Sequence, residues 1–187
     1  GRRFTSPEAK MAIEESVRRI RAIALVHETL SREAGDDVAF VEIVRPLARM
    51  VEEGMSSAEH PVHFSVEGDG AFLPAIIATP LSVVLNELLQ NAIDHAFPPH
   101  LDLQSTAGRV VVTLHNDGER LEVTVVDDGV GLPEDFSLDA VTGLGLSIVR
   151  TLVTSELMGT IQLERGSRAG ERPGTVVRLE VPVAPRD

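Results

Sequence analysis

Polar and apolar side chains separate cleanly on a helix that the sequence predicts between residues 80 and 96. At about 100° per residue, four polar residues fall within roughly a third of its circumference, opposite a row of leucines. Glu87 and Asn91, one turn apart, offer the hard oxygen ligands that suit Mg²⁺. Asn91 is the better ligand candidate and Glu87 the better base, although a solvated helix face explains these residues equally well. The polar side carries Glu87, Asn91, Asp94 and His95, and the apolar side carries Leu81, Leu85, Leu88, Leu89 and Ala92.

An acidic residue followed by two glycines ends a predicted strand in the middle of the chain. Asp127 could accept a hydrogen bond there from an exocyclic amino group. Gly129 and Gly131 would let the backbone pass close to a ligand ring. Alone, this pattern is a weak indication of a binding site, because most loops of its kind are simply turns.

Two further glycines stand directly before and inside the first turn of a helix that is predicted from residue 144. The backbone amides of Gly143 to Leu146, with the positive helix end behind them, would form a phosphate site that needs no basic side chain. A hinge before a packed helix is the alternative. Thr175, which begins the last predicted strand, could join Asp127 on a bound base or could simply cap the strand.

The elements that must position these residues follow from hydrophobic periodicity. Three-four spacing of apolar residues indicates helices, and alternation indicates strands. Asp117 and Gly118 favour a tight turn between two strands. Strands gather late in the chain and helices would cover one face, which predicts an α+β fold rather than alternating βαβ units. The predicted helices span residues 7–30, 38–53, 80–96 and 144–156, and the predicted strands span residues 62–66, 109–115, 120–126, 160–164 and 175–181.

The composition is globular and argues against several classes of function. The chain has 187 residues, enough for one well-buried domain with an appendage. A net charge of −12 and an aromatic content of 3%, all of it phenylalanine, disfavour nucleic acid as a partner. No apolar run approaches the roughly 18 residues of a membrane span, so no membrane contact is expected. The absence of cysteine excludes disulfides, and a cytoplasmic location is allowed.

In this order and at these spacings, the motifs resemble the ATP-binding fold of the GHKL superfamily, which includes histidine kinases, gyrase-type topoisomerases, Hsp90 and MutL. The Glu-x-x-x-Asn-Ala helix resembles the N box, Asp127 to Gly131 the first glycine box, and Gly143 to Leu146 the second. Gyrase, Hsp90 and MutL would require a following transducer domain, for which we expect this chain to end too soon. The preceding helix makes the chain similar to cytoplasmic sensor kinases of actinobacteria that signal to RNA-binding antiterminator regulators.

The resemblance implies a two-layer α/β sandwich that binds ATP with Mg²⁺. It implies Asn91 as the Mg²⁺ ligand, Asp127 as the reader of adenine, and Glu87 as the residue that assists transfer of the γ-phosphoryl group. Residues 132–142 match the mobile lid over the nucleotide and are unusually few. The implied cofactor-binding residues are Asn91, Asp94, His95, Asp127, Gly129, Gly131, Leu132, Gly143, Leu144, Gly145, Leu146 and Thr175.

A histidine kinase needs a histidine that attacks the γ-phosphate, and the predicted N-terminal helix contains only His27. His27 lies on an apolar seam without an Arg-x-Pro or Lys-Asn continuation, so a packed histidine is the favoured interpretation. We expect the acceptor outside this chain. Residues 1–34 would then be part of a dimerisation and phosphotransfer segment, and residues 35–187 the catalytic ATP-binding domain. The seam includes Ile13, Val17, Ile20 and Ala24 and predicts that this helix pairs with another helix or with a second copy of the chain. We expect a homodimer of the full-length protein, and the alternative is that the seam folds back on the catalytic domain.

The favoured function is therefore that of a sensor histidine kinase, whose phosphoryl group passes through a histidine to the aspartate of a response regulator. An anti-sigma-factor serine kinase shares the same motifs, but the paired-helix segment disfavours it. A non-catalytic nucleotide-binding or dimerisation module is disfavoured weakly by the presence of Glu87 and Asn91.

Overall fold

The computed structural model of the chain describes residues 37–55, 61–98, 101, 103, 106–138, 143–167 and 172–183, together with eight positions between 13 and 28. His27 and residues 139–142 of the predicted lid lie outside the described residues. In chain order the elements are β1 (Asp37–Ala39), α2 (Val41–Met55), β2 (Val62–Glu67), β3 (Phe72–Pro74), α3 (Ala75–Asn91), the π-helical η1 (Ala92–Ala96), β4 (Gly108–Asn116), β5 (Arg120–Asp127), α4 (Leu144–Thr151), the π-helical η3 (Leu152–Glu156), β6 (Thr160–Arg165) and β7 (Thr175–Pro182).

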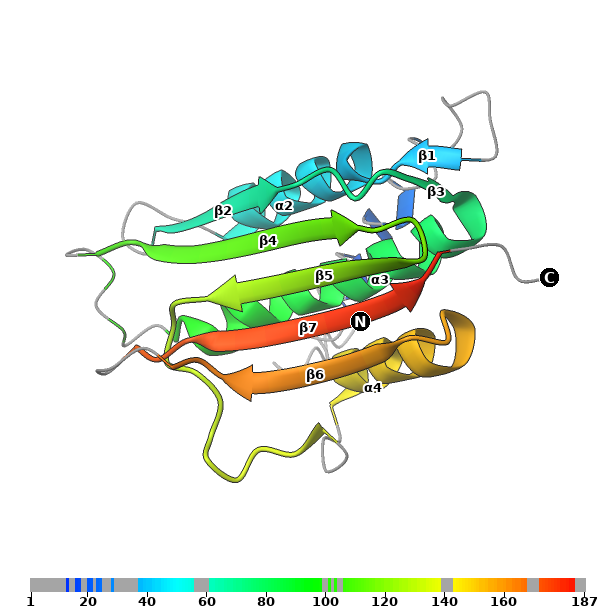
Figure 1. The fold of residues 1–187 in the computed structure, drawn as a ribbon. Coiled ribbons are helices and arrows are strands. Elements are labelled where there is room, and N and C mark those ends of the chain that lie inside the picture. Colours follow the sequence, from blue (N-terminus) through cyan, green and yellow to red (C-terminus); the bar gives the residue numbers. More distant parts are fainter. Residues whose placement is uncertain are drawn as a thin grey trace, which may run out of the picture.

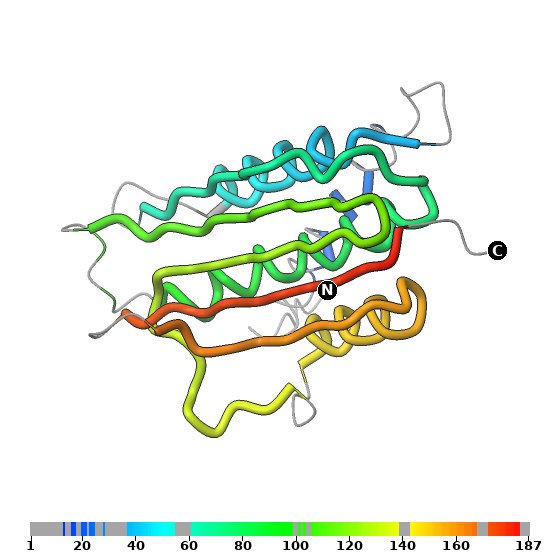
Figure 2. The backbone as a smooth tube through the Cα atoms, viewed as in Figure 1, coloured from blue at the N-terminus to red at the C-terminus, as the bar shows by residue number. Residues whose placement is uncertain are grey.

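A five-stranded sheet in the order β2-β4-β5-β7-β6 forms one layer of the fold. β2 runs parallel to β4, and the other pairings in this sheet are antiparallel. Helices α2, α3 and α4 lie together on one face of the sheet (Figure 1), and the backbone tube in Figure 2 shows the same two layers. The predicted α+β fold, with its helices gathered on one face, is confirmed. The strands predicted from alternation are confirmed to within one residue at each end.

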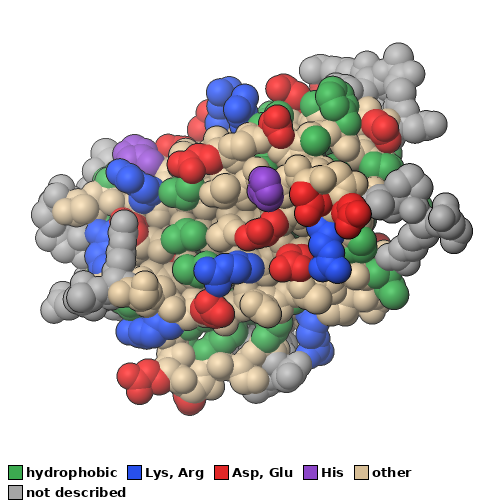
Figure 3. Space-filling view, viewed as in Figure 1, with side chains coloured by type: hydrophobic (Ala, Val, Ile, Leu, Met, Phe, Trp, Pro, Cys, Tyr) green, Lys and Arg blue, Asp and Glu red, His purple; other side chains and the backbone are tan. Residues whose placement is uncertain are grey.

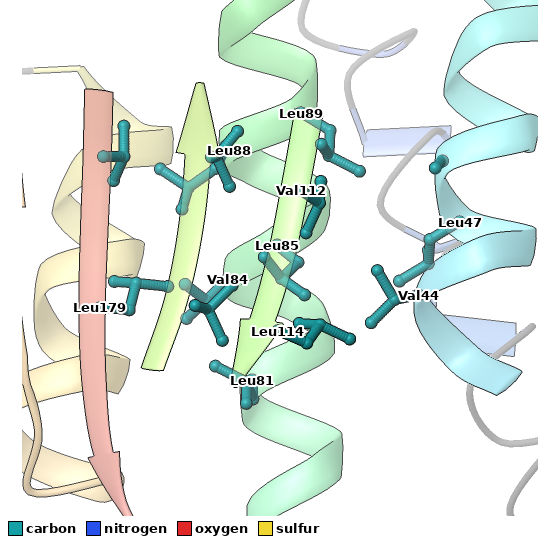
Figure 4. Packing of buried hydrophobic residues seen from close by; sticks show 14 of the residues in the cluster. Val44, Leu47, Leu81, Val84, Leu85, Leu88, Leu89, Val112, Leu114 and Leu179 are labelled. Carbon is teal, nitrogen blue, oxygen red and sulfur yellow. The ribbon is translucent and has the colours of Figure 1, made fainter. Parts of the chain in front are cut away.

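The core lies between this sheet and α3. Buried and more exposed residues alternate along β4 and β5, so that one side of each strand faces the helices. Leu81, Leu85 and Leu88 of α3 lie against these strands (Figure 4), and each is at most 3% exposed. Burial of each such side chain contributes about 1.5–3 kcal/mol, which holds the helix against the sheet. The predicted apolar side of this helix is therefore core.

The opposite face of the sheet carries acidic and basic side chains (Figure 3). Nη1 of Arg178 lies 2.7 Å from Oε2 of Glu164, and Nη1 of Arg120 lies 3.1 Å from Oε2 of Glu180. Because all four side chains are exposed, each pair contributes only about 0–1 kcal/mol. These residues explain the polar half of the alternating pattern, whereas the stability comes from the buried half.

Helix α3 begins earlier than the sequence predicted. It starts at Ala75 rather than near Pro80, and Pro80 lies inside it. A proline inside a helix leaves the carbonyl four residues earlier without its N–H donor, and that carbonyl belongs to Ile76. The side chain of Ile76 is 82% exposed, so water can reach this part of the helix. The proline is tolerated because it lies close to an exposed helix end.

The expectation that no apolar run approaches the length of a membrane span was wrong for residues 75–96. This 22-residue helix is long and apolar enough, by length and composition alone, to cross a membrane. In this fold, however, 67% of its apolar window is buried inside the protein. A core helix that is covered on most of its circumference needs such a composition without any membrane.

The second helix begins later than the sequence predicted, because residues 38 and 39, which were expected to be helical, belong to a strand. Residues 37–39 form β1, which pairs antiparallel with β3 as a separate two-stranded sheet, and α2 begins only at Val41. The N–H of Phe40 donates to the carbonyl of Ala71 at 3.1 Å, where the chain passes from strand to helix. Strands of three residues are too short to show a periodic pattern, which is why the sequence did not predict them.

The remaining predictions concern the hairpin between β4 and β5, the helix at residues 144–156 and the N-terminal helix. The turn between β4 and β5 contains Gly118 with φ +93°, and Oδ1 of Asp117 accepts the N–H groups of Arg120 and Glu119 at 2.7 and 2.9 Å. These hydrogen bonds lower the pKa of the Asp117 carboxyl. The helix predicted at residues 144–156 is confirmed as α4 continued by η3. The described positions of the N-terminal segment are helical, and their apolar side chains are 42–65% exposed, namely Ile13, Val17, Ile20 and Ile23.

Candidate nucleotide-binding site

The Asp127 carboxylate ends β5 and is only 8% exposed. Its Oδ1 accepts the backbone N–H of Gly129 at 2.9 Å and the backbone N–H of Thr175 at 3.1 Å. Burial raises the pKa of this carboxyl, and the hydrogen bonds from Gly129 and Thr175 partly oppose that rise. The structure thus brings together two of the predicted site residues, Asp127 and Thr175, which lie far apart in the sequence.

The glycines after Asp127 are required by close backbone contacts within the protein. A Cβ at Gly129 would lie 2.2 Å from the carbonyl oxygen of Ala96, the last residue of η1. Gly131 has φ +74°, and a Cβ there would lie 2.7 Å from the carbonyl oxygen of Gly174. The N–H of Val130 also donates to Ala96 at 3.0 Å. The loop therefore packs between the end of η1 and the segment that leads into β7. Both glycines are needed for this packing within the protein, which the sequence alone did not indicate.

Glu87 and Asn91 stand on the last turns of α3, close to the same end of the sheet. Glu87 is 5% exposed and Asn91 is half-buried. Within the described part of the chain, the buried Nδ2 of Asn91 has no hydrogen-bond partner, and neither has Oδ1 of Asn86 or Nε2 of Gln90. An unpartnered buried NH₂ group has a cost that a hydrogen-bond acceptor on a bound molecule could remove, and this fits an acceptor-bearing ligand beside Asn91.

Asp94 and His95 do not share the angular position that a continuous α-helix would give them. Beyond Asn91 the chain winds as a π-helix, whose i→i+5 hydrogen bonds turn it by fewer degrees per residue. Both side chains are exposed on η1, whereas Glu87 is buried. This looser winding changes the angles of Asp94 and His95 relative to Asn91, and one common polar face for all four residues remains a prediction.

The first turn of α4 presents backbone amides that no side chain caps. Gly143 is the N-cap residue, with extended backbone at φ −66° and ψ 137°. The first intrahelical bond runs from the N–H of Ser147 to the Gly143 carbonyl, so the amides of Leu144, Gly145 and Leu146 have no helical partner. Leu144 is 61% exposed, and no acidic residue lies in this turn. This helix end can bind an anion through N–H groups.

The segment between β5 and α4 bends away from the body of the molecule before it returns (Figure 2). Its first residue, Leu132, is half-buried, and its carbonyl accepts a hydrogen bond from Nη1 of Arg165 at the end of β6. A turn follows, in which the N–H of Phe136 donates to Pro133 at 3.2 Å. The base of the predicted lid is thus attached to the sheet.

The end of β5, the start of β7 and the end of α3 with η1 meet at one edge of the fold (Figure 1). The buried Asp127 carboxylate, the unpartnered amide of Asn91 and the closely packed glycines that follow Asp127 therefore lie at the same edge. Such an arrangement can bind a polar, planar group at Asp127. The uncapped amides of α4 would hold an attached anion. The fold is therefore a two-layer domain with a candidate binding site at this edge (Figure 1).

Comparison with known proteins identifies its family. The model of the histidine kinase-, DNA gyrase B- and HSP90-like ATPases matches residues 77–185, and a histidine kinase model, HisKA_2, matches residues 1–55. The chain belongs to the histidine kinase-, DNA gyrase B- and HSP90-like ATPase family, which confirms the resemblance seen in the sequence motifs.

Individual relatives are sensor kinases. The chain is 40% identical over 185 residues to the sensor histidine kinase PdtaS of Mycobacterium tuberculosis. The matched region covers 99% of this chain and 35% of PdtaS. It is 31% identical to blue-light-activated histidine kinase 2 of Erythrobacter litoralis over 89% of this chain and 46% of that protein. The chain thus spans between about a third and a half of the length of these curated relatives.

Solved structures agree with this assignment. The histidine kinase domain of the Erythrobacter litoralis EL346 kinase superposes with a TM-score of 0.74 at 26% identity, covering 89% of this chain and 74% of that one. The histidine kinase ThkA in complex with the response regulator TrrA gives a TM-score of 0.61 at 23% identity, covering 98% of this chain and 53% of that one. The second likeness concerns the fold alone.

Proposed function

We propose that this chain is the ATP-binding catalytic part of a two-component sensor histidine kinase. It would bind ATP with Mg²⁺ and deliver the γ-phosphoryl group to a histidine outside this chain, from which a response-regulator aspartate receives it. The buried Asp127 carboxylate carries the proposal, because two backbone N–H groups orient it at the edge where α3 and β7 also end. The 40% identity to a sensor histidine kinase along the chain supports the same reading.

At the base end, Asp127 would accept the exocyclic amino group of adenine. The backbone N–H groups of Gly129 and Thr175 both donate to its Oδ1, and the Thr175 side chain also hydrogen-bonds to this carboxylate. Two carboxylate oxygens offer about four acceptor sites, so Asp127 would still have one for the ligand. Gly131 and Leu132 would flank the base where the loop leaves the sheet. A base with a carbonyl in place of the amino group would set two acceptors against each other, so the site favours adenine over guanine.

At the phosphate end, the uncapped amides of Gly143 to Leu146 would hold phosphate oxygens, and His95 with Asp94 would lie beside them. Asn91 would hold Mg²⁺ through its carboxamide oxygen, and Glu87 would take the proton of the attacking group. The bound cation would neutralise charge on the transferring phosphoryl group. Residues 121–149 contain no lysine, arginine or histidine, so within this segment the helix amides would supply neutralisation together with the cation.

The partners follow from the same proposal. Residues 1–34 would form part of the dimerisation and phosphotransfer segment and residues 35–187 the catalytic domain, with a homodimer made through the exposed side chains of Ile13, Val17, Ile20 and Ile23. A response regulator would receive the phosphoryl group, by analogy with the histidine kinase ThkA, whose structure is known in complex with the response regulator TrrA. Because the proposed substrate is ATP, we also propose a cytoplasmic location for the domain.

Calorimetry tests the nucleotide site. ATP and ADP should bind the wild-type chain in the presence of Mg²⁺, and Asn91→Ala should weaken Mg²⁺-dependent binding by at least about tenfold while leaving the thermal unfolding temperature unchanged. Gln162→Ala, an exposed amide on β6, is the matched control and should bind as wild type does. Unchanged affinity in Asn91→Ala would remove the metal-site assignment.

Phosphotransfer tests the activity. The chain should phosphorylate a separately supplied dimerisation segment that contains an acceptor histidine, and the product should be labile in acid and stable in alkali, as a phosphorylated imidazole is. An acid-stable product would indicate a serine kinase instead. Nucleotide binding without any transfer would indicate a non-catalytic module.

A further inference from the structure

The segment that leads into β7 is fastened to the end of β5 by one arginine. Arg172 directs Nη2 to Oδ1 of Asp128 and Nε to the backbone carbonyl of Asp128, both at 2.8 Å. Its Nη1 donates to the carbonyl of Thr106 at 3.0 Å, just before β4 begins. One guanidinium therefore joins the segments next to three strands.

Asp128 extends this connection to β4. Its Oδ1 accepts the backbone N–H of Arg109 at 2.7 Å, and its own N–H donates to the Arg109 carbonyl at 3.1 Å. The side chains of Arg172 and Asp128 are only 20% and 17% exposed. Charge-assisted hydrogen bonds of this kind are stronger and more directional than neutral ones. A planar guanidinium serves three acceptors here in a way that a flexible ammonium would not.

The position of this cluster matters because Asp127 depends on the segment that Arg172 fastens. Thr175, three residues after Arg172, donates its N–H to the Asp127 carboxylate at 3.1 Å. Gly174 lies so close that a Cβ there would be 2.0 Å from the Asp127 carbonyl oxygen, and its N–H donates to Gly129 at 2.9 Å. Any displacement of the lead-in to β7 would therefore move a hydrogen-bond donor of the buried carboxylate.

We infer that Arg172 is a positioning residue: through Asp128 and Thr106 it fixes the lead-in to β7, and thereby the orientation of the Asp127 carboxylate toward the exocyclic amino group of the base. The inference rests on the proposed function of Asp127. Arg172 would not touch the nucleotide, and its effect would be confined to the contact with that amino group.

A pair of nucleotides isolates this contact. Purine riboside triphosphate differs from ATP only in lacking the 6-amino group, so the ratio of the two affinities measures what that group contributes. Calorimetry of the full chain with Mg²⁺ should show that Arg172→Gln binds ATP about tenfold more weakly. Binding of the analogue, which never made the contact, should change less than about twofold. The ratio of ATP affinity to analogue affinity should therefore fall towards one in the variant.

Arg178→Gln is the matched control, because Arg178 lies on β7 itself and also pairs with a carboxylate, that of Glu164 at 2.7 Å, but on the exposed face of the sheet. It should keep the wild-type ratio. If Arg172→Gln does not fold, Arg172→Lys decides by the same ratio, since an ammonium keeps the charge but not the three-way geometry. A variant with the wild-type ratio overturns the inference, even if both affinities fall together.

The failure of this inference is distinguishable from the failure of the proposed function. A wild-type chain that prefers ATP to the analogue, with Arg172→Gln preferring it equally, removes only the role of Arg172. A wild-type chain that binds neither nucleotide removes the proposed function and this inference with it.

Discussion

Replacing the Asp127 carboxylate by the carboxamide of asparagine should separate nucleotide binding from stability. The two side chains have nearly the same shape, and the asparagine oxygen can still accept the N–H groups of Gly129 and Thr175. The second carboxylate oxygen, however, becomes an NH₂ group. It would then face the amino group of adenine, donor against donor.

The expected loss of affinity follows from the hydrogen bond that disappears. A hydrogen bond to a charged group contributes about 1.5–3 kcal/mol, and an unsatisfied donor costs about 1–3 kcal/mol more. Taking roughly 3 kcal/mol in total, at about 1.4 kcal/mol for each factor of ten, ATP should bind Asp127→Asn about 100-fold more weakly.

Stability should move in the other direction. Burial raises the pKa of the Asp127 carboxyl, so the folded protein holds this proton more tightly than the unfolded chain does. As the pH rises through the interval between the unfolded and the folded pKa, the free energy of unfolding therefore falls, and at neutral pH the ionised group destabilises the fold. Asparagine has no charge to bury, so the variant should unfold at the same or a higher temperature at neutral pH.

Calorimetry and thermal unfolding on the same samples decide the matter. Asp117→Asn is the control with the opposite sign, because hydrogen bonds from the backbone of Arg120 and Glu119 lower the pKa of that exposed carboxyl. The Asp117 variant should lose stability at neutral pH and keep its ATP affinity. The reasoning is refuted if Asp127→Asn binds ATP within about threefold of wild type, or if it unfolds at a clearly lower temperature.

Other substitutions test the remaining steps. Gly174→Ala should lower the free energy of unfolding in urea by about 2–4 kcal/mol, because residue 174 has φ +76° and a Cβ there would lie 2.0 Å from a backbone atom. Gly118→Ala should lower it by only about 1–2 kcal/mol, because residue 118 has φ +93° but open space around it. Equal losses in the two variants would contradict the packing argument. Leu85→Ala, at 0% exposure, should lower the free energy of unfolding by about 2–5 kcal/mol. Glu87→Gln should slow phosphotransfer by about 100-fold at nearly unchanged ATP affinity, measured by label transfer and calorimetry; a normal rate would exclude Glu87 as the base.

Periodicity alone predicted most of the sheet, because alternation is a local property of a strand with one wet face. The strands are confirmed to within one residue at each end, and the leucine side of α3 is core as expected. The ends of α3 were harder to predict. Its start depends on water reaching Ile76 beside Pro80, and its last turn on π-helical winding after Asn91. The spacing of apolar residues predicts neither the start of α3 nor the π-helical winding that follows it.

The sequence by itself determined the family, the order of the motifs and the identity of Asp127 as a candidate site residue, because these depend on residue types along the chain. Only the tertiary structure decided that Thr175 orients Asp127, that Gly129 packs on Ala96, and that Arg172 binds Asp128. The physical reason is separation in the chain: Arg172 and Asp128 are 44 positions apart in the sequence. Such contacts follow from strand order and register, which bring β5 beside β7, and not from any local pattern.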